Sequence, residues 1–181
     1  MPYHHGNLRA ELLARAAQVV ADQGVEGLSL RSLARDLGVS HGAPAKHFRD
    51  RADLLAALAA EGVAVAEQRM AAAAVEAGSD PQARLAAMGR AYVRFAVDEP
   101  SLYGTVNHPE VCRVTPESVT RLLAGWIDAI GGSAPSEGRY ETATFVARMV
   151  GAAEVAADPG WRELLGIEDV TDELIDALLA A

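Results

Sequence analysis

The chain has 181 residues, which is enough for a buried core and for one or two domains. Half of the residues are hydrophobic, which excludes a disordered chain, and the single cysteine, Cys112, excludes an internal disulfide and a thiolate zinc site. We expect a cytoplasmic protein without membrane contact. No apolar stretch is long enough to span a bilayer, and the N-terminal residues lack the apolar run of a secretory signal.

The net charge of −9 argues by itself against a nucleic-acid partner, but the charge is unevenly divided. Residues 1–55 carry seven lysines and arginines against six acids, with four of the five histidines. Residues 56–181 carry nine arginines against 19 acids. Such an asymmetric chain can approach a polyanion with its N-terminal part first. Charge alone is equally compatible with an asymmetry that has no function.

Helical patterns follow one another along the chain, and no segment alternates with period two, so we expect an all-α protein. Polar N-caps and glycine breakers set the boundaries in the first third. The helices expected there run from Asn7 to Gly24, from Ser29 to Gly38, and from His41, after the cap Ser40, to about Phe48.

Longer helical patterns occupy the remaining two thirds. A capping box of Asp50 and Asp53 is expected to open a long helix that reaches about Ala77, and Asp80-Pro81 to open the next, which stops before Pro100. The segments expected after it are a broken stretch at 102–114, helices at 116–130 and 137–157, and two short helices that follow Asp158 and Thr171.

Residues 28–47 combine a short helix, a turn centred on Gly38 and a second short helix. This is the order of a helix-turn-helix, whose second helix enters the major groove of DNA. Leu33 and Leu37 would pack the first helix on the preceding one, and Val39 would fill the small core below the turn. An ordinary corner between two helices has the same periodicity, so the pattern alone leaves both interpretations open.

The N-terminal third also contains a specific series of residues: Gly24, Ser29-Leu30, Leu33-Ala34, Gly38-Val39-Ser40, Lys46-His47-Phe48, Arg51 and Asp53-Leu54-Leu55. With this series, the chain resembles the N-terminal domain of the TetR family of transcriptional regulators. The resemblance implies a DNA-binding domain at 1–55, which is a three-helix head with the helix-turn-helix. It also implies a helical-bundle domain at 56–181 for ligand binding and dimerisation.

The start of the chain, Tyr3-His4-His5-Gly6, and the stretch Gly42-Ala43-Pro44 resemble one branch of that family. In this branch the C-terminal domain carries a Trp-x-x-x-His-Gly signature. Here Val146 and Val150 stand at the positions of Trp and His, and only Gly151 remains. The ligand contacts of that signature therefore do not carry over.

The resemblance assigns DNA contacts position by position. The residues expected to bind phosphate are Ser29, Arg31, Lys46 and Arg51, the last through its side chain or its backbone amide. Those expected at base edges or on the exposed polar side of the second helix are Ser40, His41, Gly42, Ala43 and His47. Arg31 is equally well explained as a solvated helix residue, and His47 as a neighbour of Phe48, which we expect in the core. Family members usually have tyrosine where Ala45 stands, and its phosphate contact is missing here.

Aromatic and polarisable side chains recur in the segment before and after Pro100. A pocket lined by them would suit a mostly apolar ligand with a few polar groups. The expected pocket residues are Met88, Tyr92, Phe95, Tyr103, Asn107, His108, Cys112 and Arg148. Core packing explains Met88 and Phe95 equally well, and Arg148 requires a partner, either an acidic ligand or a surface carboxylate.

Two-fold pairing on a palindrome multiplies the few base contacts of a small head, so we expect a homodimer. The expected interface residues are Leu122, Trp126, Ala143, Ala147 and Gly151. Packing within one chain is the alternative for these helices.

The resemblance implies a regulator, most simply a repressor, that a small-molecule effector releases from a double-stranded palindromic operator. The sequence does not distinguish repression from activation. The alternative is a TetR-like ligand-binding protein with weak or lost operator binding, for which Ala45 is the main support. An enzyme is not expected, because no G-x-S-x-G, H-E-x-x-H or phosphate-loop motif occurs. Neither a cofactor nor a metal site is expected.

Overall fold

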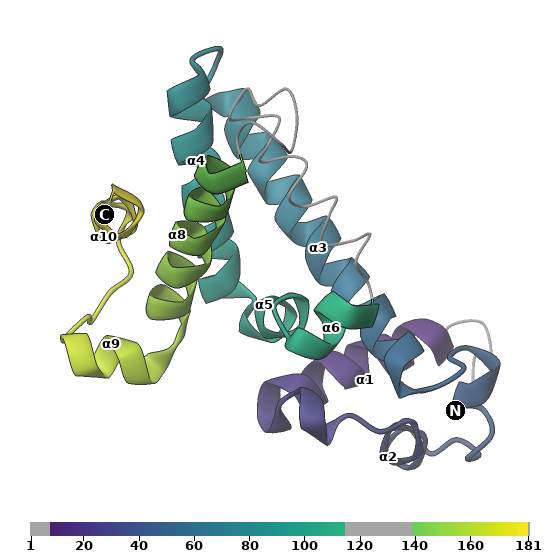
Figure 1. Cartoon of the computed structure of the whole chain (residues 1–181). Coiled ribbons are helices and arrows are strands. Elements are labelled where there is room, and N and C mark those ends of the chain that lie inside the picture. Colours follow the sequence, from purple (N-terminus) through teal and green to yellow (C-terminus); the bar gives the residue numbers. More distant parts are fainter. Residues whose placement is uncertain (1–7, 115–138, 181) are drawn as a thin grey trace. The chain divides into compact units, whose positions relative to one another are not determined.

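The computed structural model describes residues 8–114 and 139–180, and every regular element in these ranges is a helix (Figure 1). The prediction of an all-α protein is therefore confirmed. The elements in chain order are α1 (Leu8–Gln23), η1 (Val25–Gly27), α2 (Leu30–Asp36), η2 (Pro44–Lys46), α3 (Arg51–Glu76), α4 (Pro81–Asp98), α5 (Pro100–Val106), α6 (Pro109–Val114), α8 (Arg139–Ala157), α9 (Pro159–Leu165) and α10 (Asp172–Ala180); η marks a 3₁₀ helix.

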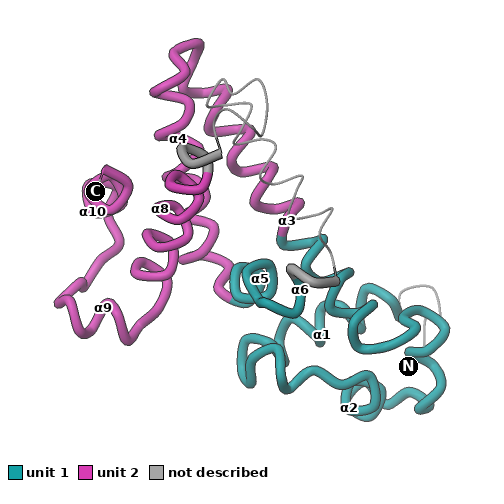
Figure 2. Tube along the Cα trace, viewed as in Figure 1, with its two compact units in different colours: residues 1–62, 101–118 teal, residues 63–100, 119–181 magenta. Residues whose placement is uncertain are grey.

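The chain forms two compact units (Figure 2). Unit 1 comprises Met1–Gly62 and Ser101–Ser118, and unit 2 comprises Val63–Pro100 and Val119–Ala181. The boundary falls inside α3, which continues from one unit into the other, and α5 and α6 return to unit 1. The functional division at residue 55 that the resemblance implies stays a prediction.

The core of unit 1 holds the helix-turn-helix in place. One face of α1 contributes Leu12 and Ala16, both fully buried, and α3 contributes Leu54 and Leu58. The remaining buried members are Leu8, Leu13, Val19, Val20, Val25, Leu28, Leu33, Phe48, Leu55, Ala59 and Val111. Phe48 is thus a core residue, as the spacing predicted. Because Val111 belongs to the same cluster, α6 shares the core of the N-terminal helices.

Unit 2 is built on the packing of α4, α8 and α10 against one another. Tyr92 and Phe95 of α4, Met149 of α8 and Ile175 of α10 are buried between these helices. Two ion pairs on the outside of the core join α4 to α10: Arg90 to Asp176 at 2.7 Å and Arg94 to Asp172 at 2.9 Å. Their carboxylates are more than half exposed, so burial of apolar surface contributes most of the stability of this packing.

Several predicted caps are present. The Asp80 carboxylate accepts hydrogen bonds from the amides of Gln82 and Ala83, with Pro81 at the first position of α4. The Asp158 carboxylate accepts one from the amide of Trp161. No helix in the described ranges is long and apolar enough to cross a membrane.

The caps in the head differ in detail from the prediction. Ser29 stands at the N-cap of α2, but its side chain makes no capping bond. Instead, the Ser32 hydroxyl donates to the Ser29 carbonyl at 2.9 Å. Asp50 caps α3 by accepting from the Asp53 amide at 2.8 Å, whereas the Asp53 carboxylate reaches one residue further back, to the Arg49 amide at 3.0 Å.

The third helix predicted from His41 to Phe48 is wrong in length and in type. Only Pro44–Lys46 is helical, as a single 3₁₀ turn. Pro44 has no amide hydrogen to donate to the carbonyl of Ser40, and Gly42 costs about 1 kcal/mol relative to alanine in a helix. The Ala43 amide bonds the Ser40 carbonyl, and the His47 amide bonds the Pro44 carbonyl, both at 2.9 Å and both three residues apart. The segment is therefore a tight turn around one 3₁₀ helix.

Candidate nucleic-acid interface

The turn between α2 and η2 is set by Gly38, whose φ of +67° lies in the left-handed region. Beyond it, the Val39 amide donates to the Ala34 carbonyl at 2.9 Å and the Gly38 amide to the Arg35 carbonyl at 3.1 Å. These two bonds form a Schellman motif, which closes the C-terminus of a helix. The chain therefore reverses sharply after α2, and Val39 packs against the core of unit 1.

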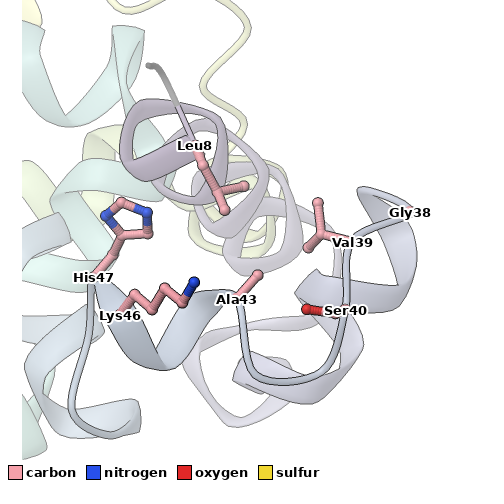
Figure 3. Close-up of a pocket in the computed structure, with 7 residues that line it drawn as sticks. All are labelled: Leu8, Gly38, Val39, Ser40, Ala43, Lys46 and His47. Carbon is pink, nitrogen blue, oxygen red and sulfur yellow. The ribbon is translucent and has the colours of Figure 1, made fainter. Parts of the chain in front are cut away.

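A hollow of about 660 Å³ lies beside this turn (Figure 3). Leu8 of α1 and Ala43 of the turn point toward each other across it. The full lining consists of Leu8, Gly38, Val39, Ser40, Ala43, Lys46 and His47. Four of these residues, Ser40, Ala43, Lys46 and His47, were predicted to contact DNA. The hollow thus has an apolar floor and a polar, cationic rim.

The cations of the head differ in whether a carboxylate of the protein neutralises them. Arg15 pairs with Asp36 at 2.9 Å, and Arg49 with Asp53 at 3.1 Å, so these charges are neutralised within the protein. Arg31 and Lys46 are exposed, and neither has an ion-pair partner within the described ranges. An exposed cation without a carboxylate partner is free to bind a phosphate.

The other predicted contacts are placed as follows. His41, Gly42 and His47 are exposed, and so is Ala45, which replaces the usual tyrosine. Ser29 is half-buried at the start of α2. The structure brings the turn residues onto one exposed segment, but which of them contact DNA stays a prediction.

Arg51 differs from this group because its guanidinium is bonded inside unit 1. Its Nε donates to the Leu28 carbonyl at 3.1 Å and its Nη2 to the Val25 carbonyl at 2.8 Å. Its Nη1 donates to both carboxylate oxygens of Glu110, at 2.7 and 2.8 Å. The prediction of a phosphate contact through this side chain therefore loses its support. The backbone amide at the start of α3, the other predicted route, is unaffected.

Glu110 and His108 were not predicted as partners of the head. His108 accepts from the Glu110 amide through Nδ1, at 3.2 Å, and its Nε2 lies 3.3 Å from the Glu26 carboxylate. The pKa of Glu26 is lowered, chiefly by a backbone hydrogen bond and next by the bond to His108. The contact between Arg51 and Glu110 could not be predicted from a local sequence motif, because the two residues are 59 positions apart.

The residues predicted to line an effector pocket are divided between the units. Met88, Tyr92 and Phe95 are buried in unit 2, whereas Tyr103, Asn107 and His108 belong to unit 1. The Asn107 side-chain amide donates to the Tyr103 carbonyl at 3.1 Å. The Cys112 side chain lies outside the described residues.

Arg148 is exposed, and its Nη1 donates to the Leu179 carbonyl at 3.4 Å. This bond gives Arg148 a backbone partner, and its predicted pairing with an acidic ligand or a surface carboxylate stays a prediction. The effector pocket itself stays a prediction.

The predicted interface residues on α8 are exposed: Ala143, Ala147 and Gly151 lie at spacings of four along one stripe. A shallow hollow of about 470 Å³ follows this stripe. Its lining consists of Thr144, Ala147, Arg148, Gly151, Ala152, Val155 and Leu178. Leu122 and Trp126 lie outside the described residues, and the interface stays a prediction.

Two family models match the sequence. The one described as "Bacterial regulatory proteins, tetR family" matches residues 12–58, and "Tetracyclin repressor-like, C-terminal domain" matches residues 85–181. No curated protein matches the chain.

Solved structures match the chain along nearly its full length. A protein of unknown function from Rhodococcus sp. RHA1 is 36% identical, with a TM-score of 0.70 over 99% of this chain and 95% of the other. A bacterial regulatory protein in the tetR family from Rhodococcus RHA1 is 18% identical, with a TM-score of 0.65 over 95% of each chain. The fatty acid degradation regulator FadR from Bacillus halodurans is 13% identical, with a TM-score of 0.73 over 98% of this chain and 95% of the other.

The tetR-family protein from Rhodococcus and FadR are similar to this chain in fold. Their similarity confirms the predicted helix-turn-helix head followed by a helical body. The C-terminal family model alone covers more than half of the sequence. Together with the N-terminal match over the helix-turn-helix, it shows that the chain belongs to the TetR family of transcriptional regulators.

Proposed function

We propose that this chain is a ligand-responsive repressor that binds a palindromic operator as a homodimer and is released by a small-molecule effector. The DNA-binding part of the proposal rests on the exposure of Lys46 and on its lack of an ion-pair partner among the described residues. This exposed cation stands without an ion-pair partner in the described ranges, on the rim of the hollow beside the turn. It is also the only lysine of the sequence.

The acidic charge of the whole chain does not oppose this proposal. Arg15 and Arg49 are neutralised by carboxylates of the head, whereas Arg31 and Lys46 are exposed and have no ion-pair partner in the described ranges. Electrostatic attraction to DNA depends on such local charge, because exposed charges more than about 10 Å apart are screened at 0.1 M salt. At low salt, where screening is weaker, the acidic body would also turn the head toward the polyanion.

Dimerisation is supported by the exposed stripe of Ala143, Ala147 and Gly151 on α8. Small residues at this spacing allow a second helix to approach closely. A dimer would present two turns to a palindrome, with half-sites about 34 Å apart. Packing against another part of the same chain remains the competing explanation for the stripe.

A second candidate function, a TetR-like ligand-binding protein that has lost its operator, is favoured by two observations. Ala45 is exposed on the turn without the tyrosine hydroxyl that usually meets a phosphate. The segment that would enter the groove is also a single 3₁₀ turn.

Selection of DNA from a random pool, followed by binding measured across salt concentrations, separates the two candidates. The repressor proposal predicts that an inverted repeat is enriched. Lys46→Ala should weaken binding to selected and unrelated DNA alike and reduce the salt slope by about one, because one phosphate contact is lost. His41 or His47 substitutions should instead change base preference.

Arg84→Ala is the matched control, because Arg84 is an exposed cation of α4 in unit 2. This variant should bind as the wild type does. Enrichment of no sequence would favour the ligand-binding module, and an unchanged slope for Lys46→Ala would remove that residue from the interface.

A further inference from the structure

We infer that Arg51 and Glu110 are positioning residues for DNA binding, and that Glu110 supports operator affinity without touching DNA. The inference rests on the proposed function, because it requires that the turn after α2 binds DNA. It replaces the phosphate contact predicted for the Arg51 side chain with a role inside the protein.

The Arg51 guanidinium connects the start of α3 to the segment that leads into α2. It bonds the carbonyls of Val25, the first residue of η1, and of Leu28, the residue after η1; both residues are almost fully buried. Ser29, the N-cap of α2, follows directly. The Val25 carbonyl also accepts from the Leu28 amide at 3.1 Å, so Arg51 is one of its two donors among the described residues. Loss of a donor to a buried carbonyl is destabilising. Arg51 therefore fixes the position at which α2 begins.

Glu110 completes this arrangement from α6. Its two oxygens accept from Nη1 of Arg51, and the two side chains are about one-third exposed (33% and 30%). A carboxylate that already holds the guanidinium repels a phosphate approaching the same group. Contact of this guanidinium with DNA would require the pair to open.

The α6 helix is itself held within unit 1 by further contacts. Val111 is buried in the core of this unit, and His108 connects the Glu110 amide to the Glu26 carboxylate of η1. These contacts hold α6, and with it Glu110, in place beside Arg51. Its position in the sequence lies outside the N-terminal family match at 12–58 and inside the C-terminal match at 85–181. A residue of the C-terminal match therefore sits in the unit that contains the helix-turn-helix.

The test compares the full-length variants Arg51→Gln, Glu110→Gln and the double variant with the wild type, on the selected DNA and across salt concentrations. We expect each single variant to lower affinity about 2- to 30-fold, the range for residues that couple indirectly to a site. The salt slope should stay at the wild-type value, because no phosphate contact is lost. The double variant should bind no more weakly than Arg51→Gln alone, since Glu110 is inferred to act only through Arg51.

Glu61→Gln is the matched control, because it removes an exposed carboxylate of α3 in unit 1. Removing an acid strengthens attraction to DNA, so Glu61→Gln should bind as well as or better than the wild type. The loss of the negative charge in Glu110→Gln should by itself strengthen DNA binding. A loss of affinity in this variant would therefore come from the broken contact with Arg51 and not from the change in charge. Circular dichroism verifies folding, and if Arg51→Gln does not fold, the affinity and slope of Glu110→Gln decide.

Three results would overturn the inference. A slope reduced by about one in Arg51→Gln, as in Lys46→Ala, would make Arg51 a phosphate contact and leave the proposed function intact. Wild-type affinity in Glu110→Gln would remove Glu110 from any role in binding. Failure of the wild-type protein to recognise any DNA would overturn the proposed function, and the inference with it.

Discussion

A cation of a helix-turn-helix contributes to DNA affinity only where its charge is not already neutralised by the protein. Lys46 and Arg51 both matched the family pattern, yet their surroundings are opposite. Lys46 is exposed on the rim of a hollow, whereas the Arg51 guanidinium holds two backbone carbonyls and a carboxylate. Residue type and position are therefore insufficient to assign a phosphate contact, and the ion-pair partners must be known.

Asp53 is a residue whose contacts support a dependence of stability on pH. The Arg49 guanidinium, and next the Arg49 amide, lower the pKa of its carboxyl group. Because the folded state favours the charged form, this carboxylate stabilises the fold at pH values above its ordinary pKa of about 3.9. The contribution is lost as the pH falls through the lower pKa of the folded state.

We therefore expect the thermal midpoint of the wild type to fall more steeply between about pH 5 and pH 3 than that of Asp53→Asn, as followed by circular dichroism. The Asp22→Asn variant is the control, because Asp22 is an exposed acid of α1. Its curve should run parallel to that of the wild type. A parallel curve for Asp53→Asn as well would show that the Arg49 contacts do not contribute.

For single residues, the sequence predicted the features that follow from the spacing of nearby residues. The burial of Phe48 follows from helical periodicity, and the capping by Asp80 follows from a short motif. The bond between Arg51 and Glu110 was beyond prediction, because it joins residues 59 positions apart through the packing of α6. The division of the chain between two units was likewise not predicted, because it assigns the neighbouring segments that end at Pro100 and begin at Ser101 to different units.

Among the elements, the segment from His41 to Phe48 differs from the prediction, because its polar and apolar pattern and its backbone favour different conformations. The polar and apolar residues from His41 to Phe48 suit a helix, but Pro44 removes an amide donor and Gly42 weakens the helical backbone. The buried Pro44 and Phe48 still anchor the segment. The order of the helix-turn-helix was therefore predictable from its core residues, whereas the conformation of its last element required more weight on Gly42 and Pro44 than on the polar and apolar pattern.

Close packing of α3 against α5 depends on Gly62, and this contact can be tested by substitution. A Cβ at this position would lie 2.7 Å from Val106 Cγ2 and 3.2 Å from the Leu102 carbonyl oxygen. Because a backbone atom cannot move aside locally, Gly62→Ala should force α5 outward. We expect a loss of about 1–3 kcal/mol in the free energy of unfolding, measured with urea.

Gly104→Ala is the control within α5 itself. Gly104 is exposed, and a Cβ there meets nothing within 4 Å. Alanine should therefore stabilise the helix by about 0.5–1 kcal/mol. Equal effects of the two substitutions would show that helix propensity, and not the approach of α5 to α3, governs this position.

On the scale of the whole molecule, the covalent path between the units suggests how a ligand could act on DNA binding. Within the described ranges, the chain passes between units at Gly62–Val63, inside the continuous helix α3, and at Pro100–Ser101. The first passage leads along α3 to Arg51, and the second leads through α5 to Glu110 of α6. Both therefore end at the ion pair that holds the segment before α2.

Under the proposed function, an effector that releases the protein from DNA must bind more tightly to a form whose two heads are wrongly spaced for DNA. Half-sites lie about 34 Å apart, so a modest change in head separation breaks the register. The effect on DNA cannot exceed the difference between the ligand's affinities for the two forms, typically about 1–3 kcal/mol. By reciprocity, operator DNA must weaken effector binding by the same factor. Calorimetric titration of a candidate effector, with operator, with unrelated DNA and without DNA, should show weaker binding only with operator. Equal affinities in all three titrations would mean that the ligand is not an inducer.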